Sequence, residues 1–188
     1  TLSSEQLAYA RERIARANLS DQVELQLRDY RDVDEQFDAI VSIEMFEAVG
    51  EAHWPVYFDQ LAHCLKPGGY AALQVITLRE ADFDHYRGTV DFIQKYVFPG
   101  GMLPPPSALA REARRAGLDD IDACMFGEDY ANTLQHWHAG FNATWPQIRA
   151  LGFDDRFRRM WNFYLTSCAA TFDSGNCDVT QITVRRPI

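Results

Sequence analysis

Several features typical of metal-binding and membrane proteins are missing from this 188-residue chain. No apolar run approaches the roughly 18 residues of a transmembrane helix, and no signal peptide is visible. The five histidines have no Cys or acid partner at metal-ligand spacing, so we expect no metal site. The four cysteines match neither a zinc nor a CxxC spacing, so we expect reduced core thiols in a cytoplasmic protein. They are Cys64, Cys124, Cys168 and Cys177.

Positive charge is also scarce. The formal net charge is -9, which argues against general nucleic-acid binding, because that function needs clustered Lys and Arg. The one dense basic cluster near aromatic residues is Arg156, Arg158 and Arg159. Such a cluster can meet a membrane surface, but the neighbouring Asp154 and Asp155 favour a solvated helix face.

What is present suits one globular domain, because 47% of the residues are hydrophobic. Ser3 and Gln6 have the spacing of a helix capping box. Segment 37–43 is nearly all apolar, which is typical of a parallel strand covered on both faces. The first 78 residues predict, in order, a helix from Ser3, strands over 23–27 and 37–43, a helix over 53–65 and a strand over 70–78.

The pattern changes after residue 78. It predicts a helix ending within 93–98, a helix over 107–116, a strand over 119–126, helices over 130–151 and 154–172, and a final strand over 179–185. Alternating strands and helices predict a doubly wound α/β sheet. Because no repeat or low-complexity linker interrupts the chain, we predict one domain over 1–188, with a helical lid inserted at about 79–172.

Glu47 is the most informative residue. It lies in the run VSIEMFEAVG (41–50), directly after the predicted strand 37–43. An acid just past the carboxyl end of a buried strand lies where open α/β sheets bind their ligands. The aromatic-rich second half of the chain can cover an apolar pocket there. The alternative is an acid favoured only by the dipole of a helix N-terminus.

Longer motifs add a family resemblance. They are TLSSEQ (1–6), VSIEMFEAVG (41–50), LKPGGY (65–70), LQVITL (73–78), IQKYVFPGGMLP (93–104), DYANTLQHW (129–137), RMWNFYLTSC (159–168) and DVTQ (178–181). With these motifs, the chain resembles the carboxyl-terminal part of cyclopropane-fatty-acyl-phospholipid synthases and mycolic acid cyclopropane synthases. The resemblance spans nearly the whole chain in the family's order. LKPGG is common among methyltransferases, whereas MFEAVG combined with KYVFPGG and YxxTLxxW is specific.

The resemblance implies a Rossmann-like fold, S-adenosylmethionine (SAM) as cofactor, and an unsaturated phospholipid as substrate. It implies a cytoplasmic protein, peripheral to the inner membrane surface, and leaves a homodimer open. In the family a Gly-rich turn that approaches the cofactor precedes TLS. Gly50 is the first glycine here. We therefore expect an incomplete catalytic domain that binds SAM weakly or not at all on its own.

Cofactor contacts are implied for residues near the N-terminus, for two residues that follow the predicted strand 23–27, and for the end of the strand at 37–43. These are Thr1, Leu2, Ser3, Gln6, Asp29, Tyr30, Ile43 and Glu44. The alternative for Ser3 and Gln6 is simple helix capping. For Asp29 and Tyr30 it is an ordinary turn after a strand.

The reaction that the resemblance implies needs a base. Methyl transfer to a cis alkene leaves a carbocation, and loss of a proton from the new methyl closes the ring. In the family the base is a bound bicarbonate, and the resemblance puts Glu47, the Ile76 backbone and Tyr130 around it. The alternative for Tyr130 is a core tyrosine. Gln74 stands where the family often has a His, and it cannot titrate near neutral pH.

Three functions therefore remain open from the sequence. The first is cyclopropane formation on a phospholipid. The second is methyl transfer without ring closure, to another lipid or to a small molecule. The third is a non-catalytic remnant of the fold, which the missing glycine turn favours.

Overall fold

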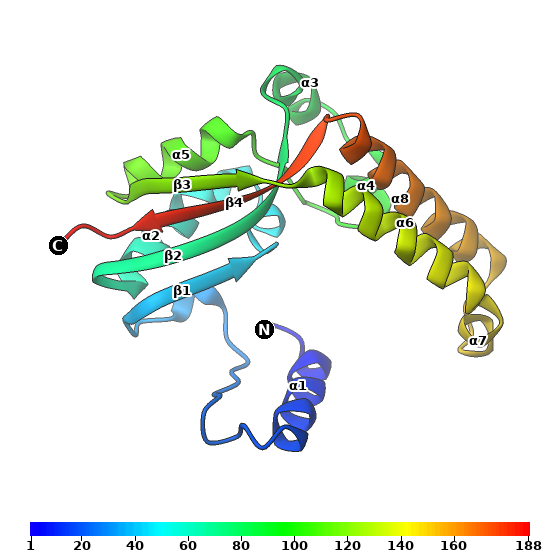
Figure 1. The fold of residues 1–188 in the computed structure, drawn as a ribbon, viewed down its shortest axis with the longest axis horizontal. Coiled ribbons are helices and arrows are strands. Elements are labelled where there is room, and N and C mark those ends of the chain that lie inside the picture. Colours follow the sequence, from blue (N-terminus) through cyan, green and yellow to red (C-terminus); the bar gives the residue numbers. More distant parts are fainter.

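The fold is built on a four-stranded sheet. The computed structural model describes all 188 residues except the side chain of Asp120. The strands are β1 (Phe37–Ile43), β2 (Leu65–Leu78), β3 (Asp119–Met125) and β4 (Cys177–Arg185), in the spatial order β1-β2-β4-β3. β1 and β2 are parallel, whereas β4 runs antiparallel to both of its neighbours. The parallel pair needs a crossover, which a helix supplies. Figure 1 shows the sheet and its helices.

Eight α-helices and four short 3₁₀ turns accompany the sheet in the described chain. The helices are α1 (Ser4–Arg16), α2 (Trp54–Cys64), α3 (Phe83–Arg87), α4 (Phe92–Tyr96), α5 (Pro106–Arg115), α6 (Gly127–Ala143), α7 (Trp145–Ala150) and α8 (Asp155–Asp173). The turns are η1 (Tyr30–Asp32), η2 (Phe46–Ala48), η3 (Glu51–His53) and η4 (Glu80–Asp82).

Two hydrophobic clusters hold these elements together. In the first, α2 and α5 pack on the sheet through buried side chains such as Phe58, Leu73 and Leu109. The second joins the ends of β2 and β4 to α6 and α8, through Leu134 and Leu165 among others. Figure 1 shows α6 and α8 side by side, projecting from the sheet to α7 at their far end. We call α6, α7 and α8 the helical arm. Along the chain, helices α3, α4 and α5 lie between β2 and β3, and the helical arm lies between β3 and β4.

The strand predicted over 23–27 is wrong. Residues 23–27 form no strand, and their backbone neighbour is Thr1, whose amino group donates to Gln26 O and whose carbonyl accepts from Arg28 N. An alternating pattern becomes a strand only where a partner strand completes the ladder. In Figure 1, α1 and this segment lie apart from the sheet.

The strand predicted over 37–43 is confirmed as β1, but the expectation that both its faces are buried is wrong. Val41 is 69% exposed and Ile43 is 55% exposed. β1 is the outermost strand of the described sheet and pairs only with β2. The apolar composition of β1 makes it suited to burial, but a strand is buried only where a neighbouring element covers it.

One predicted helix is divided in two. The segment 130–151 was predicted as a single helix, but α6 ends at Ala143 and α7 begins at Trp145. Pro146 has no backbone N–H and sits in the first turn of α7, where that loss costs nothing. Thr144 closes α6 instead, through its N–H and hydroxyl bonds to Gly140 O.

The other predicted elements are confirmed, with small shifts at their ends. They are α1, α2, α4, α5, β2, β3, α8 and β4, and the largest shift is that β2 begins at Leu65 and not at Tyr70. All four cysteines are free thiols, and Cys64 and Cys177 are buried. The prediction of core thiols is wrong for Cys124, because β3 leaves it exposed.

Among the described residues, no helix combines the length and the apolar character needed to cross a membrane.

Candidate active site

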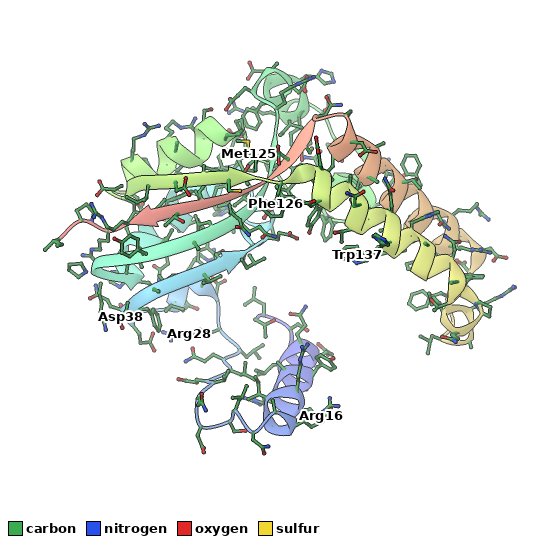
Figure 2. The ribbon with its side chains drawn as sticks, in the orientation of Figure 1. Arg16, Arg28, Asp38, Met125, Phe126 and Trp137 are labelled. Atoms are coloured by element: carbon green, nitrogen blue, oxygen red, sulfur yellow. The ribbon has the colours of Figure 1, made fainter. Side chains whose placement is uncertain are left out.

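The candidate site forms at the carboxyl ends of β1 and β2. Ile43 and Gln74 are paired in the parallel register, and Glu44 N donates to Gln74 O at 2.8 Å. Glu44 and η2 then follow β1. α6 begins nearby, after Phe126, which Figure 2 marks where β3 leads into α6. The carboxyl ends of parallel strands are the usual ligand-binding edge of such sheets.

Glu47 on η2 is a buried carboxylate with one free oxygen. Its Oε1 accepts from the backbone N–H of Ile76 at 2.5 Å. Its Oε2 is buried and has no hydrogen-bond partner among the described residues. Burial raises the pKa of Glu47, and the nearby charge of Glu44 raises it further. A buried carboxylate with a raised pKa and a free lone pair is suited to accept a proton.

Tyr130, in the first turns of α6, is held by a side-chain network. Its hydroxyl donates to Glu44 Oε1 at 2.5 Å, and Gln74 Nε2 donates to the same oxygen at 2.8 Å. Gln181 Nε2 donates in turn to Gln74 Oε1 at 2.9 Å. Burial, together with the hydrogen bond to Glu44, raises the pKa of Tyr130 well above its ordinary value. The phenol therefore stays protonated, with its proton directed at Glu44.

Glu44 has a strained backbone. Its φ is +50°, which is rare for a residue other than glycine and costs roughly 1–2 kcal/mol. Strain of this kind collects at functional sites, where the surrounding structure maintains it. Here the strained turn directs the Glu44 carboxylate toward Tyr130 and Gln74. The resemblance assigned Glu44 only to cofactor binding, so the sequence did not predict its hydrogen bond with Tyr130.

The predicted trio of Glu47, Ile76 and Tyr130 is only partly joined. Glu47 and Ile76 are in direct contact, whereas the hydroxyl of Tyr130 is bonded to Glu44. The charge of Glu47 still contributes to the raised pKa of Tyr130, so the two groups share one electrostatic environment. Gln181 was also missed, although it lies in the DVTQ segment that supported the resemblance.

The KYVFPGG segment closes over Glu47. Met102 N donates to Glu47 O at 2.9 Å, and Gln94 Nε2 donates to Gly101 O at 3.1 Å. A Cβ at Gly101 would stand 3.1 Å from Phe98 O, closer than nearly all real contacts. The glycine therefore permits the tight turn between Phe98 and Gly101.

The N-terminal residues assigned to the cofactor form a cluster of their own on α1. Ser3 Oγ accepts from Gln6 N at 3.2 Å, as predicted for a cap. The Gln6 side chain does not complete a capping box, because its Oε1 accepts from Thr1 Oγ1 at 2.7 Å. Leu2 is 75% exposed. The structure does not bring these residues into contact with Ile43 or Glu44.

Asp29 and Tyr30 behave differently from each other. Arg31 donates to both oxygens of Asp29, and these hydrogen bonds lower the pKa of Asp29 to about 2. The ring of Tyr30 lies 5.7 Å from that of Tyr57, whose hydroxyl donates to Ser42 at 2.7 Å. Tyr30 therefore lies near the end of β1, whereas the Asp29 carboxylate is already occupied by Arg31.

The site suits a cationic ligand better than an anionic one. SAM carries a positive sulfonium, which the carboxylates of Glu44 and Glu47 would attract, and the exposed Ile43 offers it an apolar contact. Bicarbonate is an anion, and the two donors proposed for it, Ile76 N–H and Tyr130 O–H, already donate to carboxylates. The residues fit SAM, whereas in this arrangement bicarbonate would find only one of its proposed partner atoms unoccupied, the Oε2 of Glu47.

Two surface hollows lie away from Glu47 and Tyr130. One, of about 480 Å³, lies between α1 and residues 20–25. The other, of about 620 Å³, lies between α6 and α8. Within the described residues, no group of three or more His, Cys, Asp or Glu side chains is arranged to hold a metal ion.

Comparison with known proteins decides the family. The family model described as "Mycolic acid cyclopropane synthetase" matches residues 1–182. The chain belongs to this family. A tuberculostearic acid methyltransferase of Mycobacterium tuberculosis is 44% identical over 99% of this chain and 44% of its own length. The cyclopropane-fatty-acyl-phospholipid synthase of Escherichia coli K12 is 36% identical over 100% of this chain and 47% of its own length.

Solved structures agree with this family and fold. A mycolic acid cyclopropane synthase, CmaA1, complexed with SAH and CTAB, has a TM-score of 0.85 and 28% identity, covering 98% of this chain and 68% of that one. A putative sarcosine dimethylglycine methyltransferase from Galdieria sulphuraria, at 15% identity and a TM-score of 0.85, shares the Rossmann-like fold. It is covered over 68% of its length, and all of this chain is matched. The chain spans about half the length of the first curated relatives.

Proposed function

We propose that this member of the mycolic acid cyclopropane synthetase family transfers a methyl group from SAM to the cis double bond of an unsaturated fatty-acyl phospholipid and closes a cyclopropane ring. One observation carries the proposal: a buried carboxylate with an unpartnered oxygen, Glu47 Oε2, lies at the ligand-binding edge of the sheet. The names of the relatives supply the substrate class, because one is a synthase acting on fatty-acyl phospholipids.

The role of Glu47 follows from its surroundings. SAM, when bound, supplies an electrophilic methyl group. Transfer would break the bond between the sulfonium sulfur and this methyl carbon, release S-adenosylhomocysteine and form a C–C bond to one alkene carbon. The carbocation left on the other alkene carbon must then lose a proton from the added methyl to close the ring. Glu47 Oε2 has a free lone pair for that proton, and the N–H of Ile76 holds the other oxygen in place. The raised pKa makes the carboxylate a better proton acceptor.

Glu44 and Tyr130 complete the polar side of the site. Tyr130 donates its proton to Glu44, so its oxygen turns a lone pair toward any ligand at this edge. Gln74 and Gln181 fix the Glu44 carboxylate through two further hydrogen bonds. We assign these groups the role of binding the cationic cofactor and orienting the acceptor. Because they are hydrogen-bonded to one another before a ligand arrives, they lose little freedom on binding.

Aromatic side chains of the arm, together with Phe98, would supply the apolar side. The ring of Tyr130 lies 5.2 Å from Phe172, and that of Phe98 lies 6.3 Å from Tyr164. Trp161 lies 4.9 Å from Tyr164. Aromatic rings bury an acyl chain and exclude water, and their faces stabilise a nearby cation. Excluding water matters because water would otherwise capture the carbocation as an alcohol.

Bicarbonate remains a prediction from the resemblance. The free Oε2 of Glu47 would accept the hydrogen of a bicarbonate, which supports the prediction. The occupied donors Ile76 N–H and Tyr130 O–H oppose it. We therefore route no proton through bicarbonate. Activity that persists after bicarbonate is stripped from the buffer would support Glu47 as the base.

Methyl transfer without ring closure is the second candidate. Gln74 stands beside Glu44, where the resemblance leads one to expect a titrating His, and the relative at 44% identity is named a tuberculostearic acid methyltransferase. If the proton leaves from a different carbon, the product is an alkene that carries the added carbon as a branch. The site groups are the same, so only the product separates the two reactions.

The test is product analysis. The purified full-length enzyme is incubated with SAM and vesicles of an unsaturated phospholipid, and the released acyl chains are examined by mass spectrometry and proton NMR. A mass gain of one CH₂ with cyclopropane ring protons supports the proposal. The same gain with vinyl protons supports the second candidate, and unmodified acyl chains count against both.

A further inference from the structure

The far end of the helical arm exposes apolar side chains. Residues 149–159, which we call the arm tip, join the end of α7 to the first turns of α8. Figure 1 shows this end of the arm as the part farthest from the sheet. Leu151 is 78% exposed and Phe153 is 42% exposed. Trp137, marked on α6 of the same arm in Figure 2, is 53% exposed. Leu151 and Phe153 lie on this protruding turn, and large apolar side chains so placed suit insertion into an interface.

The arm tip is basic, in contrast to the rest of the chain. It holds four arginines and two aspartates, whereas the whole chain has a net charge of -9. Both acids are engaged: Asp154 Oδ1 accepts from Phe157 N at 2.8 Å, and Asp155 lies 4.0 Å from Arg149. Arg156 and Arg159 are exposed and form no ion pair with any described side chain. Their charge is therefore free to meet a negatively charged partner.

A surface hollow adjoins Arg159. It has a volume of about 620 Å³ and is lined by His138, Asn142, Asp155, Arg158, Arg159 and Asn162. Asn142 Nδ2 donates to Asn162 Oδ1 at 2.6 Å, and Arg158 donates to Asn142 Oδ1 at 3.0 Å. Arg158 also lies over the Trp145 ring at 5.2 Å. These contacts fix Arg158 within the fold and leave Arg156 and Arg159 as the free cations.

We propose that the arm tip is a docking surface for an anionic phospholipid bilayer. Arg156 and Arg159 meet the phosphates of the headgroups, while Leu151 and Phe153 enter the boundary between headgroups and acyl chains. Complementary charge selects the partner, because free arginines beside exposed apolar residues fit an anionic lipid surface better than a neutral one. This proposal extends the proposed function and rests on it, because an enzyme that modifies phospholipids must approach a bilayer.

The arm tip is separate from the candidate active site. Tyr130 lies near the start of α6, and the 1.5 Å rise per residue puts the end of that helix, at Ala143, about 20 Å farther along. Substitutions at the tip therefore leave the groups around Glu47 in place. Docking can be measured without any reaction.

The test is sedimentation of this chain with vesicles. One set contains phosphatidylglycerol and the other only phosphatidylcholine. We expect binding to the anionic vesicles and little to the neutral ones. Arg156→Gln with Arg159→Gln should lower the partition coefficient about tenfold or more, since each arginine near the surface contributes. Leu151→Ser with Phe153→Ser should lower it too. The matched controls are Arg11→Gln with Arg13→Gln, and Leu27→Ser, which change exposed residues elsewhere.

Three results would overturn the proposal: no binding to anionic vesicles, equal binding to both kinds, or equal losses in the tip and control variants. A second experiment distinguishes membrane docking from methyl transfer. Methyl transfer is measured on phospholipid in vesicles and on the same phospholipid dispersed in an uncharged detergent. Docking predicts that the tip variants lose transfer only on vesicles. Transfer that is lost on neither would refute docking, and transfer absent even in the unmodified protein would refute the proposed function alone.

Discussion

At the scale of single residues, Glu47 should reduce the stability of the fold. Its carboxylate is buried, one oxygen lacks a donor, and its pKa is raised by burial. As pH rises, the unfolded chain loses this proton at its ordinary pKa, before the folded chain does. The cost to stability therefore grows above the unfolded pKa and is complete above the folded one. Glu47→Gln removes the charge and keeps an acceptor for Ile76 N–H.

We expect Glu47→Gln to raise the free energy of unfolding at neutral pH by about 1 kcal/mol, or roughly 2–4 °C in Tm. The gain should vanish in acid, below the unfolded pKa, because both proteins are then uncharged at this position. Thermal unfolding followed by circular dichroism at the two pH values measures the effect. A Tm that falls at neutral pH would show that the ionised carboxylate stabilises the fold.

The strain at Glu44 gives a second prediction at this scale. Glu44→Ala and Glu44→Gly both remove the hydrogen bonds to Tyr130 and Gln74, so their difference isolates the backbone. Because φ is +50°, the glycine variant should be the more stable by about 1 kcal/mol. Chemical denaturation measures both. Equal stabilities would mean that the turn relaxes without the carboxylate.

The residue types of the site were predictable, but their pairing was not. Glu47 stood out because a lone acid followed an apolar strand, and the structure puts it at the sheet edge. The bond from Tyr130 to Glu44 depends on where α6 returns to the sheet, 86 residues later in the chain. No local pattern fixes that return. The role of Gln181 likewise depends on the register of β4 against β2.

At the scale of elements, the start of α6 requires a glycine. Gly127 N donates to Asp178 Oδ1 at 2.8 Å, and an added Cβ would lie 3.1 Å from Asp178 Cα. We expect Gly127→Ala to lower stability by about 1–3 kcal/mol through overpacking. Gly140→Ala is the matched control on the same helix, because a Cβ there meets nothing within 4 Å.

The control should raise stability by about 0.5–1 kcal/mol, since alanine favours a helix interior. Both variants are compared with the unmodified chain by thermal unfolding. If Gly127→Ala is as stable as Gly140→Ala, the contact with Asp178 does not fix the angle at which the arm leaves the sheet.

Sequence patterns predicted the helices, whose hydrogen bonds are local, and the strands that find a partner strand within the chain. α8 begins at its Asp154 cap as expected, and β1 has the predicted bounds. The strand over 23–27 failed because a ladder partner decides strand formation. The break at Pro146 was recognisable in principle, since a proline excludes the helix hydrogen bond of its own N–H.

At the scale of the whole molecule, the exposed edge of β1 should promote self-association of this chain. An outermost strand with exposed apolar side chains is a template for pairing with another strand. Val41→Lys should reduce the association, whereas Val90→Lys, at a 73% exposed position outside the sheet, should not. Sedimentation velocity over a range of concentrations tests this. Association that both variants reduce equally would point to net charge and not to β1.

The most direct test compares methyl transfer by the full-length enzyme and by its Glu47→Gln variant. SAM with an isotope-labelled methyl group and an unsaturated phospholipid are supplied, and the label in the acyl chains is measured. We expect label in the acyl chains with the unmodified enzyme, and a loss of about a hundredfold or more when the proton acceptor is removed. Undiminished transfer by the folded Glu47→Gln protein would contradict this expectation.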